Sequence, residues 1–159
     1  MTDDNMTQAI SLDGPYFDLL ALRHEGFCCS QILVKLVLRD LGRENPEMVR
    51  AMAALCYGSG HAIGDCGILT GAACALSLSL GEAGKELPAS EFPLLLDELV
   101  GWFTASAEKS YGGIRCGDIL AASPDKRACS MLLMSTLEKL KSMRERSVQP
   151  EKGAADGAR

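Results

Sequence analysis

The sequence predicts an all-α protein, a single-domain bundle of about six helices packed around a buried central helix at about residues 66–80. Three observations lead to this prediction. Aromatic residues make up only 5% of the 159 residues, so Leu, Ala and Met must fill the interior, which favours helices packed on helices. Apolar residues recur at helical spacing between Gly and Pro residues. No segment shows the alternating pattern of a half-buried strand.

Glycine, proline and capping residues set the bounds of the expected helices. Gly42 follows an expected last turn, whereas Pro46 and Pro124 stand where a first turn tolerates proline. Asp65 is the expected N-cap of the central helix, which is apolar or small on nearly every side. The expected helices cover about 15–25, 28–41, 46–57, 66–80, 90–110 and 123–146, with a glycine-rich loop at 58–64 and a turn at 111–120.

The two ends of the chain are polar and aperiodic. We expect a flexible N-terminal segment at 1–13, a helical cysteine-rich domain at 14–147 and a disordered C-terminal tail at 148–159. The first residues lack the basic and apolar regions of a secretory signal. The longest uncharged run, 66–81, is too short and polar to span a membrane. The expected location is cytoplasmic.

The charge balance argues against two classes of partner. The chain carries 16 Lys and Arg against 21 Asp and Glu, a formal net charge of -5. No basic stripe or run of Lys and Arg is present. We therefore expect neither nucleic acid nor an anionic membrane as a partner.

Seven cysteines are more than composition requires. Their number is odd, so at least one stays free in any intramolecular disulfide scheme. Without an export signal, a structural disulfide framework is not expected. No CxxC pair, zinc-finger spacing or CxxCH haem motif is present.

Helical offsets sort some of these thiols. Cys29 and Cys129 share faces with apolar residues and are expected to point inward, while Cys28 lies nearer the polar edge of its helix. Cys66 and Cys116 follow glycine-containing breaks, where the unpaired N–H groups of a starting helix favour thiolate. Spacing alone leaves two interpretations open, because free cysteine is also a common core residue.

The chain contains, in this order, the segments "GFCCSQIL", "GDCGILTGAACALSLSLG", "GGIRCGDIL" and "ACSMLLMSTLEKL". Their order and spacing resemble a bacterial family of redox-active proteins that is named for its C-GCAxxG-C-C pattern. The resemblance covers about residues 16–140. Carried over by position, the family cysteines fall on Cys29, Cys66, Cys116 and Cys129. Because Cys28 stands directly before Cys29, the position of the first family cysteine is uncertain by one residue.

One position departs from the family pattern. Ile68 stands where the motif has Ala, but Gly67 and Gly71 are kept, so we interpret the change as a packing variant. The family is also similar to part of the split-Soret cytochromes, which implies an iron–sulfur site. Haem is not implied, because the attachment motif is missing.

The function that this resemblance implies is electron transfer. The four family cysteines would bind an iron–sulfur cluster or another metal ion and serve a redox partner protein. Backbone N–H groups would approach the sulfurs through four glycines, Gly58, Gly60, Gly64 and Gly67.

Two alternatives stay open. The same four thiols could work without metal as thiol–disulfide pairs. The chain could also be a helical interaction module without chemistry, such as a homodimer formed through its apolar helices. His24 and His61 are interpreted as surface residues rather than ligands.

Overall fold

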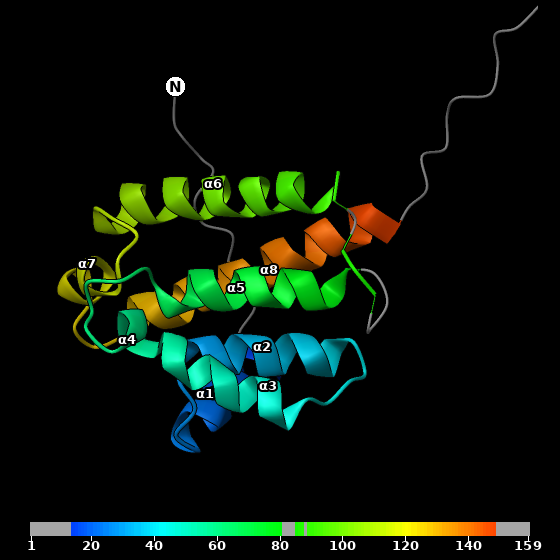
Figure 1. Cartoon of the computed structure of the whole chain (residues 1–159). Coiled ribbons are helices and arrows are strands. Elements are labelled where there is room, and N and C mark those ends of the chain that lie inside the picture. The colour runs from blue at the N-terminus through cyan, green and yellow to red at the C-terminus, as the bar shows by residue number, and fades with distance from the viewer. Residues whose placement is uncertain (1–13, 81–84, 88, 149–159) are drawn as a thin grey trace, which may run out of the picture.

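The computed structural model describes residues 14–80, 85–87 and 89–148, and these are all-α (Figure 1). The expected segment 1–13 and all but the first residue of the expected tail 148–159 lie outside the described residues. Apart from one isolated β-bridge, no strand occurs in the described ranges. The predicted fold class is confirmed. The elements are α1 (Gly14–His24), α2 (Cys29–Asp40), α3 (Pro46–Ala51), the 3-10 helix η1 (Met52–Leu55), α4 (Cys56–Ser59), α5 (Gly67–Ser79), α6 (Phe92–Tyr111), α7 (Cys116–Ala122) and α8 (Arg127–Val148).

The helix α5 is the centre of the bundle, as predicted. It lies between α2 and α6 and also packs against α8 (Figure 1). Its many small and apolar residues allow it to be buried on several sides. Fully buried side chains from α2, α5, α6 and α8 form much of the core, and they include Ile32, Leu33, Ile68, Ala72, Leu99, Phe103 and Leu133.

Small residues let α2 and α5 approach closely. A Cβ atom on Gly71 of α5 would stand 3.0 Å from the Cα atom of Ser30 on α2. The Ser30 side chain is fully buried, and its hydroxyl donates a hydrogen bond to the carbonyl of Met52 at 2.8 Å. The start of α2 is therefore fixed against both α5 and η1.

The third expected helix, 46–57, is only partly correct. It begins as predicted with Pro46, and the Asn45 side chain accepts a hydrogen bond from the N–H of Met48 at 3.0 Å. After Ala51 the chain tightens into η1, and Tyr57 then takes a left-handed conformation (φ 55°). The α-helix therefore ends at Ala51 rather than near Tyr57.

Three further expectations are wrong in detail. The expected turn at 111–120 is interrupted at Cys116, where the short helix α7 begins. The last helix begins at Arg127 rather than beside Pro124, because the side chain of Asp125 accepts the N–H of Arg127 at 3.0 Å. The N-cap of α5 is Cys66 rather than Asp65, because Asp65 belongs to the β-bridge.

No helix within the described ranges is both long and apolar enough to cross a membrane. The longest, α8, carries charged residues along its length.

Candidate functional site

The four family-matched cysteines each lie at the start of a helix. Cys29 and Cys116 are the first residues of α2 and α7, Cys66 is the N-cap of α5, and Cys129 lies in the first turn of α8. Figure 1 shows that α2, α5 and α8 all begin at the end of the bundle where α7 lies. The helix starts bring together thiols that are up to 100 residues apart in the chain.

A pair of backbone hydrogen bonds joins two of these starts. Asp65 and Arg115 form an isolated antiparallel bridge. The N–H of Cys66 donates to the carbonyl of Ile114 at 3.0 Å, and the N–H of Cys116 donates to the carbonyl of Gly64 at 3.1 Å. The first turns of α5 and α7 are thus held next to each other.

Glycines allow the close packing around the thiols. A Cβ atom on Gly67 would stand 2.9 Å from the sulfur of Cys29, so only glycine fits there without displacement. A Cβ on Gly58 would stand 2.8 Å from the carbonyl oxygen of Gly64 and 3.2 Å from the Cβ of Cys116. A Cβ on Gly60 would meet nothing within 4 Å. A side chain would therefore be crowded at Gly58 and Gly67 but not at Gly60. The approach of backbone N–H groups to the sulfurs through the four glycines stays a prediction.

Burial and mutual repulsion act on the ionisation of these thiols. The pKa of Cys66 is raised to about 12, chiefly by burial and to a smaller extent by negative charge on Cys29 and Cys129. The pKa of Cys116 is raised by burial and then by the same two neighbours. Burial also raises the pKa values of Cys29 and Cys129, and charge on Cys29 adds to the shift at Cys129. The four sulfurs form one interacting group, and at neutral pH they are thiols.

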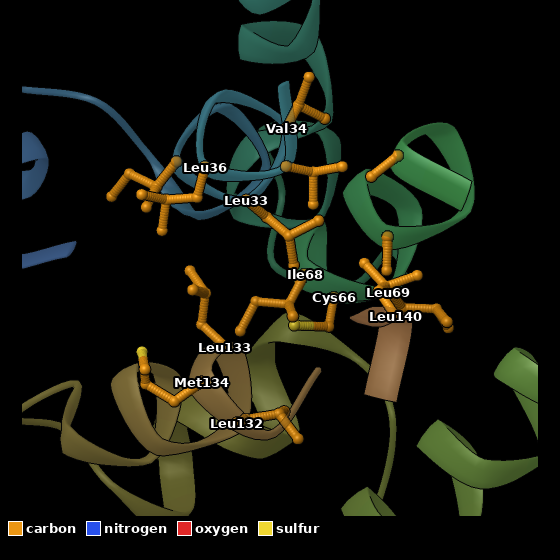
Figure 2. Packing of buried hydrophobic residues seen from close by; sticks show 14 of the residues in the cluster. Leu33, Val34, Leu36, Cys66, Ile68, Leu69, Leu132, Leu133, Met134 and Leu140 are labelled. Atoms are coloured by element: carbon orange, nitrogen blue, oxygen red, sulfur yellow. The ribbon is translucent and has the colours of Figure 1, made fainter. Parts of the chain in front are cut away.

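Backbone N–H groups partly oppose these shifts. The sulfur of Cys29 interacts with the N–H groups of Ser30 and Tyr57, which lower its pKa. Cys66 has the same kind of interaction with two N–H groups in the first turn of α5. Figure 2 shows Cys66 among the buried side chains of the core, so its donors act in a largely water-free environment.

Two cations border the group and were not singled out in the sequence. The positive charges of Arg23 and Lys126 lower the pKa of Cys129, and Lys126 also lowers that of Cys116. Arg23 donates a hydrogen bond to the hydroxyl of Ser130 at 2.7 Å, which links the end of α1 to the start of α8. No sequence signal indicated this, because the contact joins residues 107 positions apart.

The remaining cysteines are arranged differently. Cys28 and Cys56 form a disulfide, with 6.0 Å between their Cα atoms. This pairing was not predicted, since nothing in the spacing distinguishes it from other pairings. Cys74 is a half-buried free thiol on α5. Of the two adjacent candidates, Cys29 is the one whose charge interacts with those of the other three thiols.

The four sulfurs do not form a site for a single metal ion. Among the residues that the structure describes, no three His, Cys, Asp or Glu side chains are positioned to hold one metal ion. His24 and His61 are exposed, as expected. The four sulfurs are therefore gathered without surrounding a single point.

Comparison with known proteins identifies the family. The family described as "Putative redox-active protein (C_GCAxxG_C_C)" matches the chain over residues 27–143. The chain belongs to this family. The match to the C_GCAxxG_C_C family contains all four thiols of the interacting group and confirms the resemblance found in the sequence. No curated protein and no solved structure matches the chain.

Proposed function

We propose that this C_GCAxxG_C_C protein binds an iron–sulfur cluster through Cys29, Cys66, Cys116 and Cys129 and transfers electrons to or from a redox partner protein. One observation carries the proposal. Four thiols from four helix starts lie close enough for their charges to act on one another, in a chain whose family is redox-active.

The donor set fits such a cluster. Four cysteine sulfurs are the ordinary ligands of iron–sulfur clusters, and when bound the cluster supplies one-electron redox chemistry. The sulfurs do not surround one point as placed. Binding would therefore require the cysteine side chains to move towards a common centre.

The electrostatics favour a cation-bound form over free thiolates. With their raised pKa values, the four thiols are protonated at neutral pH and are poor nucleophiles. Iron would replace the protons and offset the repulsion between the sulfurs. This argues against the alternative in which the same four thiols exchange disulfides.

Other groups in the chain would hold and tune the sulfurs. Gly67 lets the start of α5 reach Cys29, and the backbone N–H of Tyr57 interacts with the Cys29 sulfur. The positive charges of Arg23 and Lys126 near Cys129 would stabilise negative charge at the site. N–H donors and positive charges would stabilise the reduced, more negative state of a bound cluster, so they are expected to raise its reduction potential.

The decisive experiment is anaerobic purification followed by an absorption spectrum and analysis of iron and sulfide. We expect visible absorption with matching iron and sulfide content. Changing any one of the four cysteines to Ser should lower the content sharply, whereas Cys74→Ser is the matched control and should leave it unchanged. Colourless protein without iron or sulfide would refute the proposal.

The alternative without metal has its own measurement. Thiols are counted before and after reduction in the anaerobic protein. Reversible loss of thiols among the four cysteines, without bound iron, would favour thiol–disulfide chemistry there instead. Full function of a variant with all four changed to Ser would favour an interaction module.

A further inference from the structure

A second pair of sulfurs lies beside the four-thiol group. Cys28 and Cys56 form a disulfide that joins the N-cap of α2 to the first residue of α4. Both residues are half-buried, so small reagents can reach them. Neither is among the four cysteines proposed to bind the cluster.

The surroundings of this pair also suit its reduced form. The hydroxyl oxygen of Ser30 lies 3.0 Å from the Cys56 sulfur and 3.5 Å from the Cys28 sulfur. Because this hydroxyl donates to the Met52 carbonyl, its lone pairs are free to accept an S–H bond. The Met52 carbonyl itself lies 3.6 Å from the Cys56 sulfur. Opening the bond therefore leaves both new thiols with acceptors nearby, and neither redox state carries an unpaired buried group.

The chain around Cys56 can adjust locally when the bond opens. Cys56 stands between η1 and the left-handed residues Tyr57 and Gly58, outside the long helices of the core. Cys28 precedes α2, and its N–H is held by the side chain of Gln31 at 3.2 Å, independently of its sulfur. Reduction therefore need not disturb the bundle.

We propose that Cys28 and Cys56 are a second redox site, a reversible two-electron dithiol that exchanges with low-molecular-weight thiols and disulfides. In the reductive direction, a thiolate attacks one sulfur of the pair and forms a mixed disulfide. The Cys28–Cys56 bond breaks, and its electron pair stays on the other sulfur, which takes up a proton. A second thiolate then attacks the sulfur of the bound thiol and releases a free disulfide and the second protein thiol. Two external thiols are oxidised for each protein disulfide reduced.

The site is tested by equilibrating the full chain with mixtures of reduced and oxidised glutathione, followed by alkylation and mass counting. We expect two thiols to appear together as the mixture becomes more reducing and to disappear when it is reversed. Cleavage before Asp65 and after Lys and Arg separates Cys56 from Cys66, so linked peptides identify Cys56 as one partner. Cys28 and Cys29 share the other peptide and are distinguished by fragmentation of the linked peptides and by the variants. A bond that stays closed in every mixture, or a linkage between other cysteines, would overturn the proposal.

Variants make the assignment specific. Cys28→Ser and Cys56→Ser should each abolish the two-thiol step, and Cys74→Ser, another half-buried cysteine, should keep it. Persistence of the step in Cys56→Ser would also overturn the proposal. The double variant Cys66→Ser with Cys116→Ser lacks two proposed cluster ligands but should keep the step. Failure of the cluster proposal and failure of this one are therefore distinguishable.

Discussion

Asp65 and Arg115 pair across an isolated β-bridge, and each is followed directly by a cysteine of the four-thiol group. The bridge brings together two helix starts that are 50 residues apart without requiring a sheet. Its two hydrogen bonds use the N–H groups of Cys66 and Cys116 themselves. Backbone rather than side-chain contacts thus fix the relative positions of these two thiols.

Gly67→Ala should destabilise the protein. The added methyl group would stand 2.9 Å from the Cys29 sulfur and 2.9 Å from the carbonyl oxygen of Leu55, so α5 must shift. We expect the free energy of unfolding, measured by urea denaturation, to fall by about 1–3 kcal/mol. Gly101→Ala on α6 is the control, because a Cβ there meets nothing within 4 Å, and it should gain about 0.5–1 kcal/mol. Equal effects would contradict this account.

The stability of the reduced, metal-free protein should fall at alkaline pH. Burial raises the pKa of Cys66 from 9.0 to about 12, so the folded state binds more protons than the unfolded state between these values. The stabilisation is complete below the unfolded pKa and is lost as pH rises through the folded pKa. Denaturation at a series of pH values checks this. Cys66→Ala should show a weaker dependence, while Leu69→Ala, which removes buried carbon but no proton, should lower stability equally at every pH.

Arg23→Gln should make two thiols less reactive. The positive charge of Arg23 lowers the pKa of Cys29 and of Cys129, so its removal raises both. We expect slower alkylation of these cysteines by iodoacetamide at fixed pH in the reduced, metal-free protein. Ser130→Ala removes the hydrogen bond of Arg23 but keeps its charge, so it should leave the rates close to those of the wild type. A slowdown of equal size in Ser130→Ala would assign the effect to structure rather than charge.

Glu98→Gln should weaken the contact between α6 and α8. Hydrogen bonds from Lys139 at 2.7 Å and from Arg146 at 2.6 Å lower the pKa of Glu98. The carboxylate therefore stabilises the fold above its unfolded pKa, and this contribution is lost as pH falls through the folded pKa. Because the group is partly exposed, the variant should lose at most about 1 kcal/mol at neutral pH. The free energy of unfolding of Glu98→Gln should also fall less at acid pH than that of Asp97→Asn, which changes the exposed neighbouring carboxylate. Denaturation at neutral and acid pH checks both.

Local signals predicted much of the fold because each acts within a few residues. Pro46 with its cap Asn45 begins a helix where expected, and the small and apolar residues of α5 predicted its central place. The same signals missed α7, which is only seven residues long. They also misplaced the start of α8, where the side chain of Asp125 accepts a hydrogen bond from the N–H of Arg127, the first residue of the helix.

The site was only partly predictable for a related reason. Helical offsets and the family pattern selected the four thiols, since both can be read from the order of residues. The Cys28–Cys56 disulfide and the charge of Arg23 beside Cys129 depend on contacts between distant segments. Such contacts are set by packing of whole helices, and one sequence does not encode them in any local spacing.

The dispersion of the four cysteines along the chain has a consequence for biogenesis. The chain must be synthesised from Cys29 to beyond Cys129 before the last sulfur can approach the other three. The helix α8 must also pack against the bundle first. Contacts of such long sequence separation form slowly compared with local helices. Insertion of the proposed cluster would therefore follow synthesis of the bundle rather than begin on the nascent polypeptide.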